Sequence, residues 1–139
     1  MAAITIPKAF HQAFPGQADQ IGAARRWVLE HLPLPDDDPR AHDIALVASE
    51  LATNAVMHSA SGCPAGRFAL QIEVEGDSTD QAGALGLTCI DMGPALVSMP
   101  RGEGEGGRGL ALVQELADAY DVVLTPTCRT VWCRLEWHR

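Results

Sequence analysis

The chain has 139 residues, 47% of them hydrophobic, and a formal net charge of −8. This length suits one domain over residues 1–139 with a real core, and the hydrophobic content excludes an intrinsically disordered chain. The negative charge argues against nucleic acid as a direct partner, and the lack of a membrane-length apolar run or a signal pattern predicts a cytoplasmic protein that does not bind membranes.

The first third of the chain predicts an edge strand followed by a helix. Residues 3–6 could form an edge strand, which Pro7 would end. A helix should begin after Asp19, which suits the N-cap position, and end before Pro33, because apolar side chains recur between them at helical spacing. Arg25 and Arg26 on this helix fit either a solvated face or a surface that binds a partner.

A second helix, over residues 40–59, carries the first candidate site. Residues 36–38 are aspartates that should help to start it. Glu50 and Asn54 lie one turn apart at the edge of its apolar stripe, and His58 continues the row. This row can supply a general base, an oxygen ligand for Mg²⁺ and a neighbour for phosphate. The same pattern also fits a helix whose border residues are polar only for solubility.

The second candidate site follows a pair of predicted strands. Residues 68–75 alternate between apolar and polar side chains, and the apolar run 85–90 should pair with them. Asp91 comes next and can accept a hydrogen bond from an exocyclic amine such as that of adenine. Gly93 lets the backbone approach a flat ring closely. Taken alone, this segment is more typical of an ordinary turn.

The third candidate site is a glycine-rich loop over residues 102–109, which leads into a helix predicted over residues 110–119. A loop of this kind offers backbone N–H groups and the positive end of a helix dipole to phosphate, and Arg108 adds a positive charge. Glu103 and Glu105 argue the other way, since carboxylates repel phosphate. A flexible surface loop with solvated charges also fits.

A closing hairpin, over residues 121–125 and 130–137, completes the predicted elements. Their order is not a regular β-α-β alternation, which disfavours a doubly wound parallel sheet. We therefore predict an α+β fold with two layers: a mixed, mainly antiparallel sheet with helices on one face. The site would lie between the helices and the sheet, under the loop at 94–107.

Together, the three segments resemble the N, G1 and G2 boxes of the GHKL ATPase superfamily, which includes gyrase, the heat-shock chaperone and histidine kinases. The short length and residues 129–135 resemble more specifically the anti-sigma-factor serine/threonine kinases (RsbW-like). The likeness runs from about residue 19 to residue 135. It implies a Bergerat-type ATP-binding fold, a histidine kinase-like ATPase domain with ATP and Mg²⁺ as cofactors.

The resemblance also implies a role for individual residues. Glu50 would be the general base, Asn54 would bind Mg²⁺, and Asp91 would read the adenine amine. The glycine loop and the start of the next helix would cover the phosphates, and Thr130 would lie beside the adenine pocket. The implied nucleotide-binding residues are Asn54, His58, Asp91, Gly93, Gly107, Arg108, Gly109, Leu110 and Thr130.

The implied function is ATP-dependent phosphorylation of a serine on an anti-anti-sigma protein, with sequestration of a sigma factor. A second interpretation is a catalytically weak or inactive ATP-binding module that acts by sequestering its partner. Residues 94–96 favour it, because they replace the second glycine of a fuller G1 box. A third, a histidine-kinase catalytic fragment, is disfavoured because no long helical hairpin precedes the domain. Family members commonly form dimers, which leaves a homodimer open.

Overall fold

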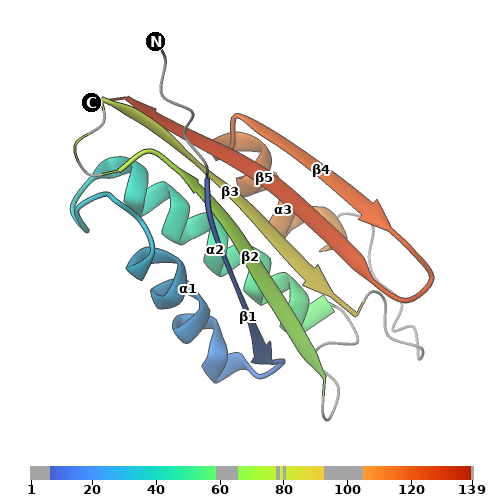
Figure 1. Cartoon of the computed structure of the whole chain (residues 1–139). Coiled ribbons are helices and arrows are strands. Elements are labelled where there is room, and N and C mark those ends of the chain that lie inside the picture. Colours follow the sequence, from blue (N-terminus) through green and yellow to red (C-terminus); the bar gives the residue numbers. More distant parts are fainter. Residues whose placement is uncertain (1–6, 59–65, 78, 80, 93–104, 139) are drawn as a thin grey trace.

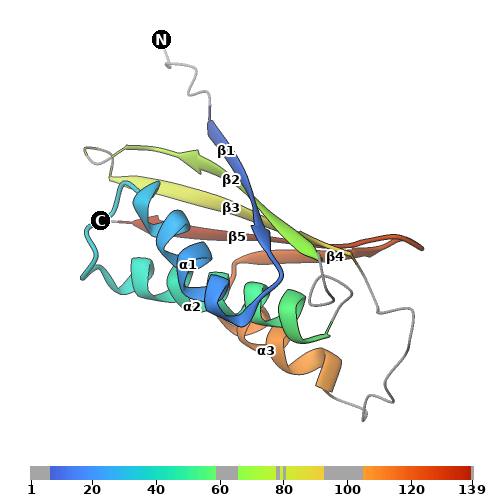
Figure 2. The same ribbon diagram turned by 90° about the horizontal axis from the view of Figure 1, so that it is seen from below.

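The structure is a computed structural model that describes residues 7–58, 66–77, 79, 81–92 and 105–138. In these residues, five strands form one antiparallel sheet in the order β1-β2-β3-β5-β4. All three α-helices lie on one face of this sheet (Figures 1 and 2). The predicted two-layer α+β architecture is therefore confirmed. The strands are β1 Lys8–Pro15, β2 Arg67–Glu75, β3 Ala82–Asp91, β4 Ala119–Leu124 and β5 Arg129–His138; the helices are α1 Ile21–Glu30, α2 Pro39–His58 and α3 Glu105–Leu116.

The N-terminal strand differs from its prediction. Residues 3–6 lie outside the described residues, whereas β1 covers Lys8–Pro15 and pairs with β2 along its whole length. Phe14 alone is buried in β1, so main-chain pairing rather than an apolar pattern defines this strand. Asp19 was wrongly predicted as an N-cap, because it lies inside a short 3-10 helix, and α1 begins without a side-chain cap at Gln20.

Helix α2 begins as the aspartate run predicts. Oδ1 of Asp38 accepts a hydrogen bond of 2.8 Å from the backbone N–H of Arg40, and Pro39 occupies the first helical position. The apolar stripe of α2 is fully buried against the sheet; its members are Ile44, Val47, Ala48, Leu51 and Ala55. No helix in the described part of the chain is long and apolar enough to cross a membrane.

Helix α3 begins earlier than the sequence predicts. It starts at Glu105, inside the glycine-rich segment, and ends at Leu116. Glycine in a helix costs about 1 kcal/mol relative to alanine. Val113 is fully buried, and Leu110 and Leu116 pack against the core beside it. This packing explains why the helix forms despite its glycines.

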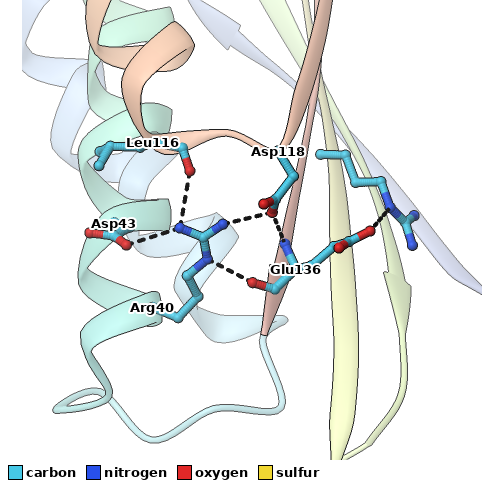
Figure 3. Close-up of polar contacts among 6 residues, drawn as sticks. Arg40, Asp43, Leu116, Asp118 and Glu136 are labelled. Carbon is cyan, nitrogen blue, oxygen red and sulfur yellow. Dashed lines mark hydrogen bonds and ion pairs between the residues drawn. The ribbon is translucent and has the colours of Figure 1, made fainter. Parts of the chain in front are cut away.

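The C-terminal end of α3 is fixed to the rest of the fold by Arg40. Its guanidinium donates hydrogen bonds to the carbonyl oxygens of Leu116 (3.0 Å) and Glu136 (2.8 Å). It also donates to carboxylate oxygens of Asp43 (3.0 Å) and Asp118 (2.8 Å) (Figure 3). One side chain thus joins the start of α2, the end of α3 and strand β5.

Candidate functional site

The most unusual polar atom of the described chain lies on α2. The side chain of Asn54 is buried, with only 3% of the residue exposed, and its Oδ1 has no hydrogen-bond partner among the described residues. Leaving such an acceptor unsatisfied costs about 1–3 kcal/mol. Glu50 lies one turn earlier on the same face of α2 and is half-buried. The predicted Glu50–Asn54 row therefore presents an oxygen with no hydrogen-bond partner in the described part of the chain.

This part of α2 lies over the end of strand β3. The Cys89 thiol is 3.8 Å from the carbonyl oxygen of Leu51, and it donates a hydrogen bond there. Helix α2 and strand β3 run in the same direction (Figure 1). Asn54 comes one turn after Leu51, and Asp91 comes two residues after Cys89 on the same side of the strand. The structure thus brings Asn54 and Asp91 to the same end of the helix–sheet interface.

The surroundings of this interface keep Cys89 uncharged. Burial raises the pKa of its thiol far above the ordinary value, and the nearby Asp91 carboxylate raises it further. The thiol is therefore a small apolar group at physiological pH, with no reactive thiolate.

Asp91 forms a buried ion pair that the sequence did not predict. Arg129 lies directly opposite it in the β3–β5 register and donates from Nη2 (2.7 Å) and Nε (3.0 Å) to the same oxygen, Oδ2. The side chains of Asp91 and Arg129 are 2% and 10% exposed. A residue expected to read a nucleobase thus already carries a positive partner.

The alternation of β5 explains why sequence reasoning missed Arg129. Val131, Cys133 and Leu135 are buried, and Arg129 shares their side of the strand. Thr130 alternates with them and therefore lies on the other face, away from the helices. The structure does not bring Thr130 together with Asp91. Arg129 is in step with the alternating apolar residues of β5, and this spacing could have predicted that its side chain faces the helices.

The remaining predicted residues lie around the start of α3 and the end of α2. Gly107, Arg108 and Gly109 belong to the first turns of α3 rather than to a loop, and only their backbone is described. The backbone N–H groups at 105–108 are those that lack a partner within the helix. Leu110 is partly buried against the core. His58 is the last residue of α2, with only its backbone described, and Gly93 lies outside the described residues.

The donor chemistry of this site fits a hard cation that is shared with phosphate. No group of three or more His, Cys, Asp or Glu residues able to hold a metal occurs in the part of the chain that the structure describes. Mg²⁺ does not require such a cage, because phosphates and waters usually complete its octahedron around one or two protein oxygens. The buried Oδ1 of Asn54 is an oxygen of the required kind.

Comparison with known proteins identifies the family that this arrangement resembles. The family model of the histidine kinase-like ATPase domain matches residues 14–135, which is most of the chain. The match confirms the predicted likeness to GHKL-type ATPases and supports ATP binding. A search among curated proteins found no significant match.

Proposed function

We propose a specific activity for this chain, which belongs to the histidine kinase-like ATPase domain family. In this proposal it is an ATP-dependent protein serine/threonine kinase and anti-sigma factor. Family membership by itself supports an ATP-binding regulatory role. The observation that carries the proposal is the buried Oδ1 of Asn54, which lies one turn from Glu50 on α2 and has no hydrogen-bond partner among the residues that the structure describes. The proposed substrate is a serine on an anti-anti-sigma protein, and the proposed sequestered partner is a sigma factor.

The binding roles follow from the chemistry of each group. Oδ1 of Asn54 would hold Mg²⁺, which when bound neutralises charge on the β- and γ-phosphates. The N-terminus of α3 would donate its backbone N–H groups to the phosphate oxygens, and Arg108 would add a fixed positive charge. The Asp91 carboxylate would accept a hydrogen bond from the base. These groups come from three separate elements, so a bound nucleotide would connect α2, β3 and α3.

In the proposed transfer, Glu50 is the general base. Its carboxylate takes the proton from the substrate serine as the serine oxygen bonds to the γ-phosphorus. The bond from that phosphorus to the β–γ bridging oxygen breaks, and ADP leaves with the electron pair. Positioning of the two reactants and stabilisation of charge provide most of the rate enhancement.

A second candidate function is a weak or inactive ATP-binding module that sequesters its partner. The Asp91–Arg129 pair favours it, because a nucleobase must share this carboxylate with a guanidinium 2.7 Å away. In this alternative the nucleotide acts as a switch, and no phosphoryl group is transferred.

Calorimetric titration of ATP, with and without Mg²⁺, tests the site. Binding should require Mg²⁺, and Asn54→Ala should weaken it by roughly tenfold or more, which corresponds to about 1.4 kcal/mol. Equal affinity in the parent and in Asn54→Ala would remove Asn54 from the site. No binding at millimolar ATP would refute the proposed nucleotide site in the isolated protein.

Transfer of labelled γ-phosphate to an anti-anti-sigma protein tests the activity. Glu50→Gln should bind ATP like the parent and abolish transfer, whereas the matched control Glu30→Gln, an exposed glutamate on α1, should leave both unchanged. Transfer by Glu50→Gln at the parent rate would show that Glu50 is not the base. Tight ATP binding by the parent without any transfer would favour the sequestering module.

A further inference from the structure

The polar groups at the end of β3 form a pair rather than a single carboxylate. Asp91 and Arg129 lie on neighbouring strands, both on the helix side of the sheet. Both hydrogen bonds from Arg129 go to one carboxylate oxygen of Asp91. Because the two side chains are almost fully buried, their charges are weakly screened by water.

This pair should persist when a nucleotide binds. Breaking a buried ion pair by removing one partner is strongly destabilising, because a charge is left buried and uncompensated. A single hydrogen bond to a base edge contributes far less free energy and cannot offset that cost. A base that reaches Asp91 therefore meets an acceptor and a donor together.

The edges of the two purines differ in what they offer to such a pair. Adenine presents an amine donor at the position where guanine presents the acceptor O6. A lone carboxylate can only accept, so it binds the adenine amine and repels the guanine O6. An arginine has five N–H donors, and Arg129 uses two nitrogens on Asp91. A guanidinium here can donate to O6 while the carboxylate accepts the neighbouring ring N–H of guanine.

We propose that Arg129 is a specificity-determining residue that lets this site accept guanine nucleotides as well as adenine nucleotides. The inference rests on the proposed nucleotide site, and it concerns only the base that the site admits. Affinity would then depend mainly on the phosphate end of the ligand, where Asn54 and the start of α3 lie, and little on which purine is attached.

The test compares the dissociation constants of Mg²⁺-ATP and Mg²⁺-GTP. The parent should bind the two within about threefold. Arg129→Thr keeps a hydroxyl that can donate to Asp91 but removes the guanidinium, so it should prefer ATP by roughly tenfold or more, about 1.4 kcal/mol. Arg129→Lys keeps the positive charge and should stay close to the parent ratio. The matched control is Arg134→Thr, on the opposite face of β5, which should leave the ratio unchanged.

The outcomes separate this inference from the proposed function. Binding of ATP with at least tenfold preference over GTP in the parent would overturn the inference and leave the nucleotide site intact. An unchanged ratio in a folded Arg129→Thr variant would also overturn it. If that variant fails to fold, the parent and Arg129→Lys ratios decide the question. No binding of either nucleotide would refute the nucleotide site, and the inference with it.

Discussion

Replacing Arg40 with alanine should destabilise the fold, because this one side chain joins three elements. Its guanidinium donates to the carbonyl of Leu116 at the end of α3 and to the carbonyl of Glu136 in β5. It also pairs with the carboxylates of Asp43 and Asp118. The Arg40 side chain is 20% exposed, so these bonds form in a partly desolvated environment. Its removal breaks this link between the end of α3, the start of α2 and β5.

The contacts set the size of the expected effect. The two bonds to main-chain carbonyls should contribute about 1–2 kcal/mol each, since the donor is charged. The ion pairs to Asp43 and Asp118, whose side chains are 30% and 45% exposed, should add only about 0.5 kcal/mol each. The freedom that the arginine side chain regains offsets about 1–2 kcal/mol. We therefore expect Arg40→Ala to lower the free energy of unfolding by about 2–3 kcal/mol and Tm by roughly 10 °C.

Urea unfolding followed by circular dichroism measures this difference. Arg40→Lys should recover less than half of the loss, because a lysine cannot reproduce the four hydrogen bonds that the planar guanidinium donates. The matched control is Arg26→Ala, an exposed arginine on α1, which should change stability by less than about 0.5 kcal/mol. An Arg40→Ala variant as stable as this control would refute the reasoning.

Three further outcomes concern single groups. Hydrogen bonding from Arg134 lowers the pKa of the Glu75 carboxyl below its ordinary value of 4.5. The stability that this pair contributes is therefore fully present above pH 4.5 and is lost as the pH falls through the lowered pKa. Glu75→Gln should therefore flatten the acid limb of a plot of urea midpoint against pH. Burial raises the pKa of the Cys133 thiol to about 12, so stability should fall above the ordinary value of 9.0, where the unfolded thiol ionises. Cys133→Ala should reduce that alkaline slope, and an unchanged slope would contradict the burial argument. Asn54→Leu removes a buried acceptor that has no hydrogen-bond partner within the described residues. It should raise the free energy of unfolding by about 1 kcal/mol while abolishing Mg²⁺-dependent ATP binding, as thermal unfolding and calorimetry would show.

Where the sequence pattern was strong, the fold could be predicted. Strand β2 alternates cleanly, and its inward residues Phe68, Leu70, Ile72 and Val74 are all buried. Helix α2 carries a continuous apolar stripe, so both its extent and its buried face were predicted correctly. The closing hairpin was also predicted, because two short β-rich runs flank a turn at Pro126. In each of these elements, side-chain periodicity and burial agree.

Where tertiary contacts override local preference, the prediction failed. Strand β1 exposes nearly all its side chains and exists through main-chain pairing with β2, which leaves no apolar pattern to detect. The glycines at 106, 107 and 109 predict a loop, yet the packing of Val113 below them supports a helix from Glu105. Local propensity predicts neither the pairing of β1 with β2 nor the packing of α3 on the core, because both involve residues far apart in the chain.

The candidate site shows the same limit in its chemistry. Short sequence motifs predicted Asn54 and Asp91 as site residues. They could not show that the two side chains differ in whether they already have a polar partner. Asp91 is satisfied by Arg129, whereas the Oδ1 of Asn54 has no hydrogen-bond partner in the described part of the chain. A ligand that bonds to Asn54 removes an existing penalty, whereas a ligand that bonds to Asp91 must share an existing partner. A ligand contact with Asn54 on α2 should therefore contribute more to the binding free energy than a contact with Asp91 at the end of β3. Truncating the nucleotide from its phosphate end should accordingly weaken binding far more than exchanging its base.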